Sequence, residues 1–110
     1  FFKEPSMITL EVTQKFSAAH YIKNAGKCAN VHGHNYVIKT AVKGMIEDYF
    51  LMDAKVLKQI VQVNILNLCD HQLLNDVFEF VPSCELLCNE FAKLIQRQLP
   101  KNIKLHSLEL

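Results

Sequence analysis

Three histidines and one cysteine stand close together in the first third of the chain. His20 ends a Phe-Ser-Ala-Ala-His segment, and Cys28, His32 and His34 follow soon after it. In an extended segment, residues two apart point to the same face, so His32 and His34 can reach one ion. Three imidazoles leave a fourth position open for water or substrate, as in a catalytic zinc site. The spacing therefore predicts a zinc centre at His20, His32 and His34.

Cys28 lies in a polar loop between Lys27 and Ala29, where a purely structural cysteine is uncommon. A neighbouring lysine and a nearby dication would both favour the thiolate, which is the reactive form. Three interpretations stay open from the residues alone. Cys28 is a fourth ligand that closes a structural site, a nucleophile or base, or an inert thiol.

Two further positions carry groups that suit proton transfer or ligand recognition. Asp70 precedes His71, and a carboxylate that orients an imidazole favours proton exchange near neutral pH, although a capping or surface role is the alternative. Glu109 is either solvated or accepts paired N–H donors from a guanidine-like heterocycle. Glu85 opens a predicted helix, where a carboxylate complements the helix dipole.

The histidines are positioned by a predicted hairpin. Residues 7–16 and 35–43 alternate between apolar and polar side chains and are rich in β-branched types, which predicts two strands. The segment between them is too short for a clear crossover helix, so we expect an antiparallel pair. That pairing brings His20 and His34 to the same end.

The rest of the chain predicts two helices and a last strand. Residues 54–66 have helical apolar spacing behind Asp53 as N-cap, and a second helix runs from Ser83 as N-cap to Leu99. Residues 102–110 alternate again and predict a third strand. The order strand, strand, helix, helix, strand predicts an α+β domain, with two helices packed on one face of an antiparallel sheet.

Composition indicates one globular domain over residues 1–110, with 50% hydrophobic and 21% charged residues. A net charge of +1 argues against nucleic acid or an anionic membrane as partner. No apolar run approaches the roughly 18 to 20 residues that cross a bilayer, and we expect a cytoplasmic protein. We expect the remaining cysteines, Cys69, Cys84 and Cys88, to be reduced and packed as small hydrophobes.

Taken together, these residues resemble the 6-pyruvoyltetrahydropterin synthase / 6-carboxytetrahydropterin synthase family. The matching segments follow one another along nearly the whole chain: residues 16–20, 26–28, 32–36, 69–71 with 74–75, 82–85, and Glu109. The resemblance implies a T-fold whose subunits assemble as trimers stacked into a hexamer, with active sites at subunit interfaces. It also implies zinc on the three histidines and 7,8-dihydroneopterin triphosphate as substrate.

Roles for the other candidate residues come from the same resemblance. It implies that Cys28 is the general base and that Asp70 and His71 form a proton relay. It implies that Glu109 anchors the pterin ring. The segment Ser83, Cys84 and Glu85 matches the one that lines the pterin pocket, although the family usually has Pro-Thr-Ser-Glu there.

The product depends on the branch of the family. The compact spacing between Cys28 and His32 is similar to that of the 6-carboxytetrahydropterin enzymes of queuosine biosynthesis. The alternatives are a 6-pyruvoyltetrahydropterin synthase of the biopterin pathway and a non-catalytic zinc-binding or pterin-binding module. The family normally continues past its pterin glutamate with a last strand, whereas this sequence stops at Leu110.

Overall fold

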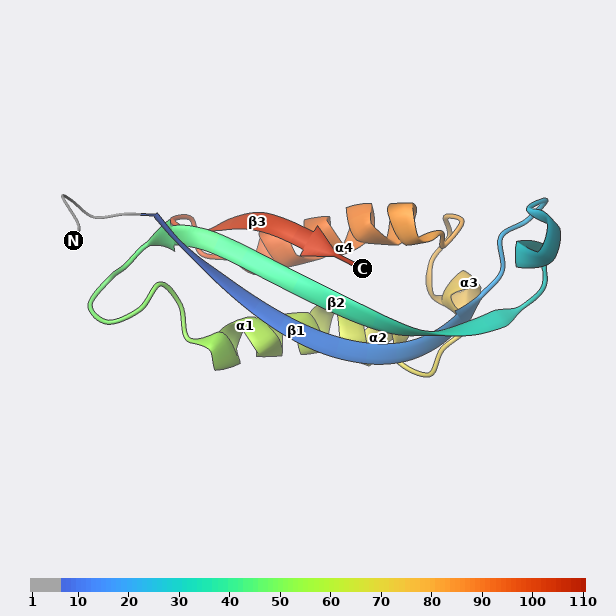
Figure 1. The fold of residues 1–110 in the computed structure, drawn as a ribbon, viewed down its shortest axis with the longest axis horizontal. Helices are drawn as coiled ribbons and strands as arrows, with labels where there is room; N and C mark the ends of the chain where they lie inside the picture. The colour runs from blue at the N-terminus through green and yellow to red at the C-terminus, as the bar shows by residue number, and fades with distance from the viewer. Residues whose placement is uncertain (1–6) are drawn as a thin grey trace.

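The computed structural model describes residues 7–110, which form one antiparallel sheet with helices packed against it (Figure 1). The sheet has three strands in the order β1-β2-β3. The strands are β1 (Met7–His20), β2 (His32–Met45) and β3 (Lys104–Glu109). The helices are α1 (Ala54–Val61), α2 (Asn67–Cys69), α3 (Leu74–Val77) and α4 (Cys84–Gln98). The predicted α+β architecture is confirmed.

The hairpin of β1 and β2 is the longest feature of the molecule. Its strands pair from Met7 opposite Met45 to His20 opposite His32, so they extend beyond the predicted strands and include the candidate ligands. β3 pairs only with Lys39–Lys43 of β2. In the described part of the chain, residues 32–38 of β2 therefore pair with β1 alone, and the sheet narrows to a two-stranded ribbon at this end.

Both long helices cover the same face of the sheet. Phe16 of β1 and Ile38 of β2 share one buried cluster with Val61 of α1 and Phe91 of α4. The ring of Phe16 meets that of Phe91 edge to face, with 6.3 Å between centroids. Side chains of alternate residues point to opposite faces of a strand, so the odd-numbered positions of β1 and β2 lie on the other face, which we call the outer face.

The predicted helix starts are confirmed. The side chain of Asp53 accepts a hydrogen bond from the backbone N–H of Lys55 at 2.9 Å, and that of Ser83 accepts one from Leu86 at 3.3 Å. Each therefore satisfies a backbone donor that has no partner inside its helix.

The first predicted helix differs in its second half. After α1 the chain makes a π-helical turn over Gln62–Leu66 and then continues as α2. The side chains of Gln62 and Asn67 are hydrogen bonded at 2.6 Å across this turn. The short α3 was not predicted. Among residues 7–110, no helix combines the length and apolar character that membrane crossing requires.

Candidate metal centre

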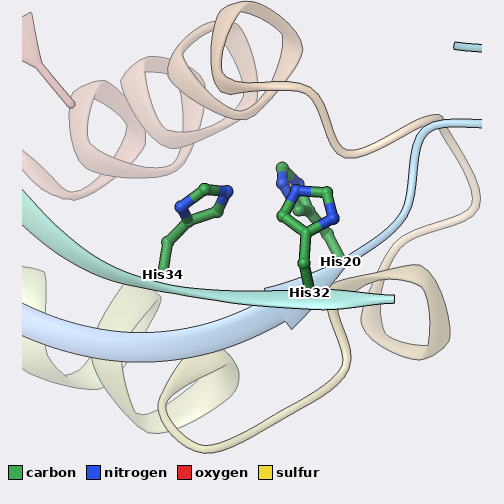
Figure 2. A group of neighbouring side chains, drawn as sticks. All are labelled: His20, His32 and His34. Carbon is green, nitrogen blue, oxygen red and sulfur yellow. The ribbon is translucent and has the colours of Figure 1, made fainter. Parts of the chain in front are cut away.

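The three predicted zinc ligands meet at the ribbon end of the hairpin. His20 is the last residue of β1, while His32 and His34 open β2. Because His20 lies opposite His32 and His34 lies opposite Ala18, all three side chains rise from the helix-covered face (Figure 2). One ring nitrogen from each lies within 4.8 Å of the others, so the three side chains can hold one metal ion.

Backbone carbonyls fix two of the imidazoles in the orientation that a metal needs. The Nδ1 atom of His20 lies 2.7 Å from the carbonyl oxygen of Pro82, and Nδ1 of His32 lies 2.7 Å from that of Asn30. A carbonyl oxygen only accepts hydrogen bonds, so each Nδ1 carries the proton and each Nε2 keeps its lone pair. Imidazole ligands with the second nitrogen bonded in this way suit a borderline divalent ion such as zinc.

The three ligands differ in burial. His20 is only 4% exposed, whereas His32 is half-buried and His34 is exposed. Partial burial lowers the pKa of His34 below its usual value, and the charges of the neighbouring His20 and His32 lower it further by smaller amounts. The neutral imidazole that a metal ion binds is therefore favoured at His34.

Tyr36 lies beneath the metal centre. Its ring centroid is 6.3 Å from that of His20 and 5.6 Å from that of His34, and it stacks on Phe16 at 4.9 Å. Burial, with smaller contributions from the Cys84 and Cys69 thiols, raises the pKa of Tyr36 to about 12. The hydroxyl is thus neutral, and the aromatic pair joins the site to the core.

Cys28 lies near the histidines but outside their group. It belongs to the 3-10 turn Gly26–Ala29 in the connection between β1 and β2, where its thiol is exposed. Hydrogen bonds from Ile22 N–H to its carbonyl and from its own N–H to Ala25 hold the turn. Within residues 7–110, the group whose ligand atoms can share an ion consists of the three histidines, and the Cys28 thiol lies outside it.

Asp70 and His71 form a pair at the edge of β1 that faces away from β2. The Nδ1 atom of His71 lies 3.1 Å from Oδ1 of Asp70, and the same oxygen accepts the backbone N–H of Ser17 at 3.0 Å. The hydrogen bond from the N–H of Ser17 lowers the pKa of Asp70 below its usual value, and the hydrogen bond from His71 lowers it further.

His71 is held in an unusual backbone conformation. Its φ is 60°, which is uncommon for a residue with a side chain, and its N–H donates to the carbonyl of Ser17 at 2.6 Å. Its side chain is 82% exposed and lies beside Ser17 and Asn35 on the outer face. His34 lines the same hollow, but its side chain rises from the helix-covered face, so within one chain His71 does not face the three imidazoles.

The other two candidate substrate contacts fall on different sides of the sheet. Ser83, Cys84 and Glu85 lie at the start of α4, next to the metal centre, because the preceding Pro82 bonds His20. Burial, and the charge of Glu85, raise the pKa of the Cys84 thiol. Glu109 is paired with Lys39 of β2, so it lies on the outer face, away from the three histidines.

Several partners of the site were not predicted from the sequence. The carbonyls of Pro82 and Asn30 leave no signature in residue type, since every residue carries a carbonyl. Tyr36 had a usable signal, because it follows His34 by two positions in a strand and so shares its face.

Comparisons with known proteins found a matching family model and several relatives. Residues 9–110 match the family model described as 6-pyruvoyl tetrahydropterin synthase. The chain is 37% identical over 98 residues to an Archaeoglobus fulgidus protein that carries the name 6-carboxy-5,6,7,8-tetrahydropterin synthase, covering 87% of this chain and 83% of the relative. It is 30% identical over 95 residues to a Pyrococcus furiosus dihydroneopterin monophosphate aldolase, covering 86% and 81%.

A shorter match and a solved structure point the same way. Over 70 residues the chain is 37% identical to a Dictyostelium discoideum 6-pyruvoyl tetrahydrobiopterin synthase, covering 61% of this chain and 52% of the relative. The fold superposes on the 6-pyruvoyl tetrahydropterin synthase of Caenorhabditis elegans with a TM-score of 0.76 at 25% identity, covering 94% of this chain and 95% of that one.

Proposed function

The chain belongs to the 6-pyruvoyl tetrahydropterin synthase family, and we propose that it is a zinc-dependent carbon–oxygen lyase that converts 7,8-dihydroneopterin triphosphate to 6-carboxy-5,6,7,8-tetrahydropterin. The observation that carries this proposal is the three-histidine centre with its carbonyl-oriented imidazoles. The name of the Archaeoglobus relative and the short spacing between Cys28 and His32 support the carboxy product.

Different residues of the chain carry out the separate proton transfers of this reaction. Bound zinc would stabilise negative charge on the side-chain oxygens of the substrate. Cys28, as thiolate, removes a carbon-bound proton, and its exposed position leaves it accessible to a ligand. His71, oriented by Asp70, exchanges protons elsewhere on the side chain, and triphosphate leaves by elimination. Addition of one water and cleavage of the bond between the first and second side-chain carbons then give the 6-carboxy group and acetaldehyde.

The site requires more than one copy of the chain. His71 and Glu109 lie on the outer side of the sheet, while the three histidines lie on the helix-covered face. We therefore propose a homo-oligomer, a trimer or hexamer, in which one copy supplies the metal and another supplies His71. A mixed assembly of His34→Ala and His71→Ala subunits should recover part of the activity that each variant alone lacks. No recovery in verified mixed oligomers would contradict this arrangement.

The deciding experiment is to identify products by mass after zinc-loaded protein is incubated with 7,8-dihydroneopterin triphosphate. A 6-carboxy product with acetaldehyde is the expected result. A 6-pyruvoyl product is the alternative that the Dictyostelium relative favours, and an aldolase product from the monophosphate is the one that the Pyrococcus relative favours. Bound zinc without turnover on either substrate would indicate a non-catalytic module.

Replacing Cys28 tests the proposed base separately. Cys28→Ala should abolish turnover while the protein keeps one zinc per chain, because the thiol lies outside the three-histidine group. Zinc content by atomic absorption and product formation are measured on the same sample. Loss of zinc and of folding together would instead identify Cys28 as a structural ligand.

A further inference from the structure

The outer face of the ribbon end contains a hollow beside His71. Ala19 and Gly33 lie opposite each other there, and a Cβ atom placed on Gly33 would meet only the carbonyl of Ala18, at 3.9 Å. These two small residues form the floor, and His71 with its two following residues forms a wall along the edge of β1. The hollow has a volume of about 480 Å³.

A second hollow of about 450 Å³ continues from the first along the strands. It shares Ser17, Asn35 and His71 with the first and extends to Lys15 and Val37. We call the two together the outer groove. His71 and Asn35 line both hollows, whereas Lys15 lines only the second, so Lys15 lies at the end of the groove away from Ala19 and Gly33.

Asn35 is held in place by Ser17. The two residues face each other across the hairpin, and the hydroxyl of Ser17 donates to Oδ1 of Asn35 at 2.8 Å. With its oxygen engaged, the amide of Asn35 keeps both Nδ2 hydrogens for a ligand in the groove. A ligand there must therefore present acceptor oxygens.

The charges of the second hollow favour an anion at its far end. Lys15 is exposed and makes no ion pair within residues 7–110. The carboxylate of Asp70 also lines this hollow, but its Oδ1 accepts the N–H of Ser17 and faces His71. The free positive charge of the groove is thus at Lys15.

We propose that the outer groove is the subsite for the phosphate chain of the substrate, with Asn35 donating to the oxygen nearest the reacting carbons and Lys15 binding the phosphates beyond it. This proposal deepens the proposed function, because it rests on His71 acting at the substrate side chain. Lys15 then lies beyond the shared His71 and Asn35, as the phosphates lie beyond the reacting side-chain carbons of the ligand. Primary ammonium and amide donors both bind phosphate oxygens well.

The test compares Lys15→Ala with Lys39→Ala in the zinc-loaded protein. Lys39 is the matched control, since it lies on the same face of the same sheet but outside both hollows, opposite Glu109. Calorimetric titration with inorganic triphosphate should give about tenfold weaker binding for Lys15→Ala, because a charge-assisted hydrogen bond is lost. Lys39→Ala should stay within about twofold of the parent protein, given the low worth of exposed charges. Equal weakening by both variants would overturn the proposal.

The neutral part of the subsite is tested by a double-mutant cycle. Asn35→Ala should weaken binding of inorganic triphosphate, and Ser17→Ala should do so less, by releasing Asn35. Because Ser17 acts through Asn35, the double variant should bind no more weakly than Asn35→Ala alone. Additive losses would show that Asn35 does not depend on Ser17 and would contradict this step.

A last comparison separates the subsite from the lyase activity. Lys15→Ala should weaken binding of 7,8-dihydroneopterin triphosphate but not of unphosphorylated 7,8-dihydroneopterin. If Lys15→Ala shows this selective loss but the parent protein does not convert the substrate, the subsite is supported and the lyase activity is refuted. Turnover with an unchanged KM in Lys15→Ala would refute the subsite and leave the lyase standing.

Discussion

The three metal ligands should contribute unequally to stability although they contribute alike to metal binding. His20 is 4% exposed and bonds the carbonyl of Pro82, whereas His34 is exposed. His20→Ala leaves that carbonyl without its partner, which costs about 1–3 kcal/mol, and it also leaves a void. We expect the free energy of unfolding of the metal-free protein to fall by about 2–4 kcal/mol. His34→Ala should change it by less than about 0.5 kcal/mol.

Thermal unfolding followed by circular dichroism in the presence of a chelator measures this difference. One kcal/mol corresponds to roughly 4–8 °C in a domain of this size, so His20→Ala should lower Tm by about 8–32 °C and His34→Ala by less than about 4 °C. Both variants should lose the rise in Tm that zinc produces in the parent protein. Protein concentration must be held constant, because association also shifts Tm.

A second variant makes the reasoning refutable. In His20→Asn, the side-chain amide can donate to Pro82 as Nδ1 does, but it offers no metal ligand in place of Nε2. It should recover much of the stability lost in His20→Ala without recovering zinc binding. Equal Tm losses in His20→Ala and His34→Ala, or no recovery in His20→Asn, would refute the proposed role of the carbonyl.

Two further predictions concern the Asp70 carboxylate and a crowded glycine. The N–H of Ser17 and the side chain of His71 hold the pKa of Asp70 below its usual range. The ionised carboxylate therefore stabilises the folded protein above about pH 4, and this stabilisation is lost as the pH falls through the folded-state pKa. The Tm of the parent should therefore exceed that of Asp70→Asn at neutral pH, with a gap that closes in acid; a gap independent of pH would contradict this. A Cβ on Gly44 would lie 3.0 Å from the carbonyl oxygen of Asn102, so Gly44→Ala should destabilise the protein to denaturant by about 1–3 kcal/mol. The control Gly33→Ala should not, because its Cβ would meet only the carbonyl of Ala18 at an ordinary contact distance of 3.9 Å, and similar losses in both would contradict the steric argument.

Local patterns predicted the elements of the fold that depend on a few neighbouring residues. The sequence predicted the alternating strands β1 and β2 and the helix caps Asp53 and Ser83, because each of these features depends on groups that are close in sequence. The π-helical turn Gln62–Leu66 was not, since the same apolar spacing fits an uninterrupted helix. The hairpin extends farther than its alternation indicates because His32 and His34 pair as strand residues despite their polarity.

The site was predictable to the extent that one hairpin builds it. His20 and His32 meet because they are partners in a single register, which the sequence pattern indicates. The carbonyl of Pro82 comes from a distant segment and is recognisable only in the folded chain. The face on which Glu109 lies depends on the pairing of β3 with β2, a long-range contact that alternation within residues 102–110 does not determine.

The narrowing of the sheet at the metal end bears on local unfolding. Two paired strands by themselves are only marginally stable in water. At this end residues 32–38 of β2 pair with β1 alone, and the other edge of β1 is bonded only by the short segment that begins at His71. Local opening there should therefore need less free energy than opening near Lys39–Lys43, where β3 adds a third strand. An ion held by His20 on one strand and by His32 and His34 on the other would join the two and oppose that opening. Backbone amides of the ribbon end should exchange with deuterium quickly in the metal-free protein and slow markedly on zinc binding, so the metal would complete a part of the fold as well as a site.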